Sequence, residues 1–167
     1  MLSLKNNRIV FNDLYYLNVS KFGTNTNVHR ASRVDDESKE CMIKVYRNNY
    51  VQGNIANLMQ IQEEIQILQR VNHPNIIKYI GHSFPSRRIA PISIYLIHEF
   101  APMGDLFDYC KRYGPLSETE SRIHFSQLCD AVEYLHGHGI AHLNLKLENI
   151  LLDEDWNIKL SGFDYAT

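Results

Sequence analysis

A chain of 167 residues with 44% hydrophobic residues can bury a core of its own and is ordinary for one domain. The formal net charge of −2 argues against nucleic acid or an anionic membrane surface as the main partner. No apolar run approaches the roughly 20 residues that span a bilayer, and the N-terminus lacks the apolar core of a secretory signal. Three cysteines without metal-ligand spacing favour a reducing, intracellular and cytoplasmic location: Cys41, Cys110 and Cys129.

Short strands dominate the first part of the chain. Runs with β-branched and aromatic content predict five of them, over 15–19, 28–32, 40–46, 76–80 and 92–100. Between the third and fourth strands, apolar residues recur at helical spacing along one face, at Leu58, Ile61, Ile65, Leu68 and Val71. Pro74 ends this helix, because proline disfavours helical geometry in the residue before it.

Helices dominate the second part. Gly104-Asp105 begins a short helix that ends at Gly114-Pro115. Ser117 and Glu120 have the spacing of a capping box and begin a longer helix. Four apolar residues of this helix are expected to face inward: Phe125, Leu128, Val132 and Leu135. A hairpin of strands 149–152 and 158–160, turned at 153–157, is predicted after it.

The stretch from His142 to Asn149 points to a chemical role. It reads H-L-N-L-K-L-E-N and resembles the catalytic loop of protein kinases, H-R-D-L-K-x-x-N. In that family the aspartate accepts the proton of the substrate hydroxyl, the lysine neutralises the moving phosphate, and the final asparagine holds a magnesium ion. The resemblance implies the last two roles for Lys146 and Asn149. Asn144 stands at the position of the base, and an amide cannot take a proton as a carboxylate does.

Other parts of the kinase pattern surround this loop. Cys41 to Lys44 resembles V-A-I-K, so Lys44 is expected to touch the nucleotide phosphates and to pair with Glu64 of the following helix. The family's phosphate-binding loop has the pattern G-x-G-x-x-G-x-V, and in residues 21–28 only the middle glycine, Gly23, and the valine, Val28, match it. An ordinary hairpin turn is an equally good interpretation of these residues. The resemblance implies eight nucleotide-binding residues: Gly23, Val28, Met42, Lys44, Glu64, Glu99, Ala101 and Leu151.

Two of the residues near the expected adenine site are unusual for the family. Met42 replaces a small residue, and its flexible thioether is able to fill part of the pocket. His98 precedes the expected hinge at Glu99-Phe100-Ala101, and we interpret it as a partly buried histidine with a local hydrogen bond.

The metal-binding segment departs furthest from the pattern. Residues 158–166 align with the strand and D-F-G motif of kinases, but Gly162 stands where the magnesium-binding aspartate belongs and Asp164 where the glycine belongs. A carboxylate two residues further along an extended chain is displaced by roughly 6–7 Å, too far for a bond of about 2.1 Å to the metal. A histidine metal cluster at His136, His138 and His142 is disfavoured, because no cysteine or carboxylate completes a familiar zinc pattern.

These observations lead to an expected fold and function. The fold is α+β and protein-kinase-like: residues 1–100 form an N-lobe with a five-stranded antiparallel sheet and one helix, and residues 101–167 form the hinge and an incomplete, mainly helical C-lobe. The lysine in Asn144-Leu145-Lys146 favours the Ser/Thr type. We expect a catalytically impaired, pseudokinase-like binding module, with weak or absent ATP and Mg²⁺ binding.

The resemblance also implies partners and leaves alternatives open. A full-length kinase, or a kinase substrate or regulator, is the expected protein partner, and no nucleic acid or membrane is expected. Because the family's later C-lobe elements lie beyond Thr167, the helix that starts at Ser117 is expected to expose an apolar face. An active Ser/Thr kinase and a fragment of a longer kinase-family product are the two alternatives.

Overall fold

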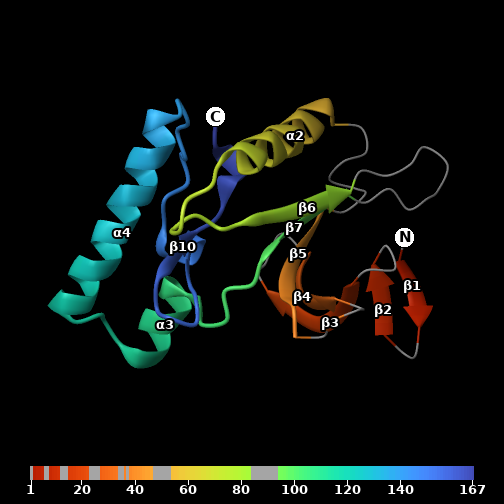
Figure 1. Ribbon diagram of the computed structural model, residues 1–167, viewed down its shortest axis with the longest axis horizontal. Coiled ribbons are helices and arrows are strands. Elements are labelled where there is room, and N and C mark those ends of the chain that lie inside the picture. Colours follow the sequence, from red (N-terminus) through yellow and green to blue (C-terminus); the bar gives the residue numbers. More distant parts are fainter. Residues whose placement is uncertain are drawn as a thin grey trace. The chain divides into compact units, whose positions relative to one another are not determined.

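The computed structural model describes the backbone of residues 2–5, 8–11, 15–22, 27–33, 36, 38–46, 54–83 and 94–167, and the side chains from Val28 onward within these ranges except that of Ser83. Figure 1 shows the arrangement of strands and helices within it. The chain divides into two compact units. Unit 1 contains residues 1–58 and 79–100, and unit 2 contains residues 59–78 and 101–167.

Unit 1 is built on one antiparallel sheet. Its strands are β1 (Leu2–Lys5), β2 (Arg8–Phe11), β3 (Tyr15–Phe22), β4 (Asn27–Arg33), β5 (Glu40–Tyr46), β6 (Tyr79–Ser83) and β7 (Ile94–Glu99), in the order β1-β2-β3-β4-β5-β7-β6. Among the described residues this sheet has seven strands where the sequence predicted five, because β1 and β2 pair with each other and β2 adds to β3. These two strands have four residues each, which is too short for alternation to stand out in a sequence.

The core of unit 1 lies around the middle of the sheet. Five of the seven residues of β5 are buried, and two of them, Cys41 and Ile43, pack with Ala31 of β4 and Ile97 of β7 in one buried cluster. The register places Cys41 opposite Glu99 and Lys44 opposite Leu96. Burial raises the pKa of the Cys41 thiol to about 12, so it remains protonated.

Helix α2 (Ile55–Arg70) extends across the division between the units. Its buried residues include Ile61, Ile65 and Leu68, as the helical spacing predicts, together with Ile67 and Glu64. The predicted start of the strand over 76–80 is wrong, because β6 begins at Tyr79. Ile76 instead forms an isolated parallel bridge with Leu160 in unit 2.

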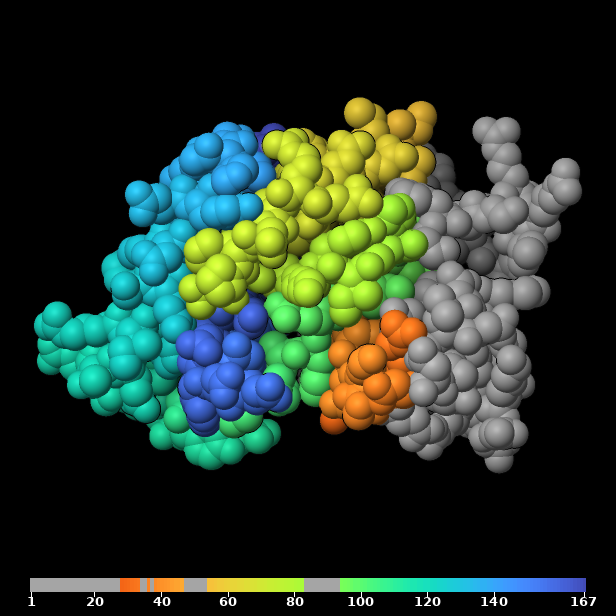
Figure 2. Space-filling view, viewed as in Figure 1, coloured from red at the N-terminus to blue at the C-terminus, as the bar shows by residue number. Residues whose placement is uncertain are grey.

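Unit 2 combines helices with a small sheet. Helices α3 (Leu106–Tyr113) and α4 (Glu118–Gly137) accompany strands β8 (Gly104–Asp105), β9 (Ile150–Leu152) and β10 (Ile158–Leu160), which pair antiparallel in the order β10-β9-β8. In Figure 2 the blue hairpin residues lie against the green and cyan helices. A buried cluster joins the hairpin to α3: Leu106, Ile150, Leu152 and Ile158.

The capping box of α4 is confirmed, and one inward residue is corrected. The Ser117 hydroxyl accepts from the Glu120 N–H, and the Glu120 carboxylate accepts from the Ser117 N–H. Phe125, predicted to face inward, is 66% exposed. The buried face carries His124, Ala131 and Leu135 instead, because the 3.6-residue period places position 125 about 100° from position 124. No helix of the described residues is long and apolar enough to cross a membrane.

Candidate functional site

His142 links the loop that precedes β9 to the segment that follows β10. Its ring is 3% exposed and lies edge-on to Phe163, with centroids 4.8 Å apart. Nδ1 lies 3.2 Å from the backbone nitrogen of Asn144 and therefore accepts its hydrogen, while Nε2 lies 2.9 Å from the Ser161 carbonyl oxygen. The neutral ring with its hydrogen on Nε2 satisfies both partners. Burial lowers the pKa of His142 and favours the same neutral form.

Four more hydrogen bonds hold this region together, three of them between the two segments and one within the loop. The Asn144 side-chain Nδ2 donates to the Gly162 carbonyl at 3.3 Å, and the Asn149 Nδ2 donates to the Asn144 carbonyl at 2.8 Å. The Asn149 carbonyl in turn accepts from the Ser161 N–H at 2.8 Å and from its hydroxyl at 3.0 Å. The structure thus brings together three residues that the sequence singled out: Asn144, Asn149 and Gly162.

Gly162 has a backbone conformation and surroundings that suit glycine. Its φ of 79° and ψ of 44° lie in the left-handed region. A Cβ atom built on it would lie 2.3 Å from Cγ and Nδ2 of Asn149 and 2.5 Å from Oδ1. The side chain of Asn149 therefore occupies the space that a carboxylate-bearing side chain at position 162 would need.

Asp164 lies in the 3₁₀ turn Phe163–Tyr165, where its carbonyl accepts from the Gln60 Nε2 at 2.6 Å. Burial lowers the pKa of His142, and the charge of Asp164 acts against this by raising it.

A magnesium ion does not fit this set of donors. Mg²⁺ prefers an octahedron of oxygen ligands at about 2.0–2.1 Å with at least one carboxylate. Here Gly162 has no side chain, and the amide nitrogens of Asn149 and Asn144 donate to carbonyls, which leaves two amide oxygens and no carboxylate at position 144 or 162. Within the part of the chain that the structure describes, no three His, Cys, Asp or Glu side chains come together in a metal-binding group.

The other predicted site residues of unit 2 are Lys146, Leu151 and Ala101. The Lys146 side chain is exposed, and its carbonyl accepts from the Asn149 N–H at 3.0 Å. Leu151 is paired with Lys159 in β10 and with Asp105 in β8. Ala101 is 7% exposed.

In unit 1 the sheet register gathers several predicted residues. Val28 of β4 lies directly opposite Lys44 of β5, and Met42 lies opposite His98. Lys44 is 8% exposed, with Nζ 5.0 Å from the centroid of the Tyr46 ring. His98 is half-buried, and its Nδ1 lies 3.1 Å from the Glu99 carbonyl oxygen, in agreement with the interpretation as a histidine with a local hydrogen bond.

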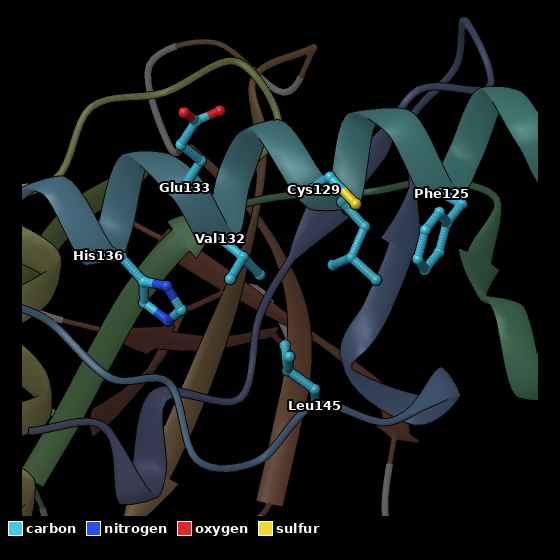
Figure 3. Close-up of a pocket in the computed structure, with 7 residues that line it drawn as sticks. Phe125, Cys129, Val132, Glu133, His136 and Leu145 are labelled. Atoms are coloured by element: carbon cyan, nitrogen blue, oxygen red, sulfur yellow. The ribbon is translucent and has the colours of Figure 1, made fainter.

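A second feature of unit 2 is an apolar groove, which we define by its lining residues: Phe125, Leu128, Cys129, Val132, Glu133, His136 and Leu145. Its volume is about 410 Å³. Figure 3 shows Phe125, Val132 and His136 on the side of α4 toward which Leu145 projects, whereas Glu133 points away. Leu145, between Asn144 and Lys146 in sequence, is 50% exposed, so the groove borders the loop described above.

Comparison with known proteins identifies the family. Residues 21–167 match the protein kinase domain. The chain belongs to the protein kinase domain family. Its fold is accordingly kinase-like and α+β, with an antiparallel N-lobe sheet followed by helices.

The similar kinases include Ser/Thr kinases from animals and a plant protein kinase. Serine/threonine-protein kinase SIK1 of Mus musculus is 43% identical over 111 residues, which are 66% of this chain and 14% of that protein. Serine/threonine-protein kinase SIK2 of Gallus gallus has the same identity over 66% of this chain and 13% of its own length. CBL-interacting protein kinase 8 of Oryza sativa subsp. japonica is 36% identical over 84% of this chain and 30% of its own length. The chain thus spans less than a third of these kinases.

Not every kinase position is brought together by the structure. Gly23 lies outside the described residues. Lys44 and Glu64 lie in different units, and their pairing stays a prediction. Sequence reasoning missed Ser161, which makes two bonds to the Asn149 carbonyl. A serine beside a glycine in a loop is a weak signal for such side chain–backbone bonding.

Proposed function

We propose that this kinase domain is catalytically impaired and acts as a regulatory, protein-binding module with weak or absent ATP binding. The observation that carries the proposal is that positions 144 and 162 present an amide and a hydrogen in place of two carboxylates. Loss of a general base lowers a rate roughly 10²- to 10⁴-fold. Loss of charge neutralisation by a metal costs several kcal/mol more, and each 1.36 kcal/mol is about tenfold in rate.

The apolar groove supports the protein-binding role. Phe125 and Leu145 are 66% and 50% exposed, and exposed apolar patches rimmed by polar residues are typical of protein interaction sites. The partner we propose is a protein of the kinase system: a full-length kinase, or a kinase substrate or regulator. The groove would receive an apolar segment of that protein.

Phosphoryl transfer tests the proposal. The purified chain, incubated with γ-labelled ATP, Mg²⁺ and a general Ser/Thr protein substrate, should transfer no label above the level of a Lys44→Ala variant. Lys44 is the matched control, because any residual transfer by a contaminating kinase would be unchanged by its substitution. Transfer that is present in the wild type and lost in Lys44→Ala would contradict the proposal and favour the alternative, an active Ser/Thr kinase.

A further inference from the structure

We infer that Asn144 is a positioning residue: its side-chain amide holds the Ser161–Asp164 segment in the backbone conformation that Gly162 adopts. The two departures from the kinase pattern, Asn144 and Gly162, therefore depend on each other. The inference rests on the impaired site proposed above and assigns a structural role to two of its residues. The amide at position 144 cannot act as a base, but it has a structural role.

The first step concerns the donor. Asn144 Nδ2 donates to the Gly162 carbonyl at 3.3 Å, and its backbone N–H is held by His142 at 3.2 Å. Aspartate has the same shape as asparagine but, when ionised, only accepts hydrogen bonds. In Asn144→Asp a negative oxygen would face the carbonyl oxygen of Gly162, and the carbonyl would lose its donor.

The second step concerns the space beside the glycine. A Cβ at position 162 would approach the Asn149 amide to 2.3 Å, so the Asn149 side chain would have to move. That movement would break its 2.8 Å bond to the Asn144 carbonyl. Substitution of Gly162 therefore acts on Asn144 through Asn149, in addition to the strain of a side chain at a φ of 79°.

As a consequence, the family's residue cannot be restored at position 144 or at position 162 without disturbing the other position. An aspartate at 144 alone disturbs the segment at 162, and a side chain at 162 alone displaces Asn149 from the loop. Neither single change rebuilds the arrangement of oxygen ligands that magnesium requires.

The experiment measures urea unfolding of the purified chain without nucleotide or metal. At pH 7.5, Asn144→Asp should raise the unfolding equilibrium constant roughly five- to thirtyfold, and more than Asn144→Ala does. The difference in unfolding equilibrium constant between Asn144→Asp and Asn144→Ala should become smaller as the pH falls toward 5. A protonated carboxyl group can again donate a hydrogen bond to the Gly162 carbonyl.

Two comparisons isolate the effect. Asn54→Asp makes the same charge change at an exposed helix N-cap where the side-chain oxygen only accepts, from Ala56 and Asn57, and should leave stability unchanged. Gly162→Ala should destabilise less in an Asn149→Ala background than in the wild type, because the close contact with the amide is gone.

Each outcome decides for or against the inference. Equal stability of Asn144→Asp and Asn144→Ala at every pH, or additive effects of Gly162→Ala and Asn149→Ala, would overturn it. If Asn144→Asp fails to fold while Asn144→Ala and Asn54→Asp fold, the inference is supported. Because no nucleotide is present, these results are independent of the phosphoryl-transfer assay, and either proposal can fail alone.

Discussion

Histidines in this chain illustrate how burial sets the chemistry of single residues. Burial lowers the pKa of His73, His98 and His142, and that of His98 falls to about 4. The neutral His142 follows from its partners, since Nδ1 must accept a hydrogen from Asn144. The sequence alone predicted a local hydrogen bond for His98, but the size of the pKa change depends on packing that no motif specifies.

These lowered pKa values predict a loss of stability in mild acid. Between the folded-state pKa and the ordinary value near 6.5, the unfolded chain binds more protons than the folded chain, so the free energy of unfolding falls as the pH falls. For His98, with pKa values of about 4 in the folded and 6.5 in the unfolded chain, the loss between pH 6.5 and 5 is at most about 1.5 kcal/mol. Urea unfolding at several pH values checks this.

The matched variant is His98→Gln, which keeps a donor for the Glu99 carbonyl but does not titrate. Its stability should depend less steeply on pH than that of the wild type. His136→Gln, at an exposed position on α4, makes the same substitution outside the sheet and is the control for it. Equal slopes for the wild type and His98→Gln would show that the pKa of His98 is close to its ordinary value.

Among the elements, α4 shows what a sequence pattern can and cannot predict. The capping box and the end of α3 at Gly114 follow from local chemistry, and both are present. The inward face was misjudged at Phe125 because periodicity gives an apolar stripe but not the neighbours that cover it. His124, buried with Nε2 3.0 Å from the Trp156 carbonyl, was missed since histidine is not counted as apolar.

Two substitutions on α4 test this assignment of its faces. Leu135 is fully buried, so Leu135→Ala should lower the free energy of unfolding by about 2–5 kcal/mol. Phe125→Ala, on the exposed side, should change it by about 0.5 kcal/mol or less, while reducing the fluorescence of a dye that binds apolar surface. A large loss of stability in Phe125→Ala would mean that the groove is closed in solution.

At the scale of the whole molecule, motif order was sufficient to predict the kinase fold, and residues 21–167 match that family. The number of strands was not predictable, because β1 and β2 are short and lie before the matched residues. The identities at 144, 149 and 162 were readable from the sequence. Their hydrogen bonds, and the occupation of the space beside Gly162 by Asn149, required coordinates.

A thermal shift of the purified chain with ATP, with and without Mg²⁺, tests the proposed loss of the metal-dependent site most directly. A ligand at a hundredfold excess over its Kd stabilises the native state by about 2.7 kcal/mol, which for a chain of this size raises Tm by roughly 5–10 °C. We predict no magnesium-dependent rise in Tm. A clear rise with Mg²⁺ that is lost in Asn149→Ala would contradict this proposal and mean that Asn149, with ligands from positions other than 162, holds the metal.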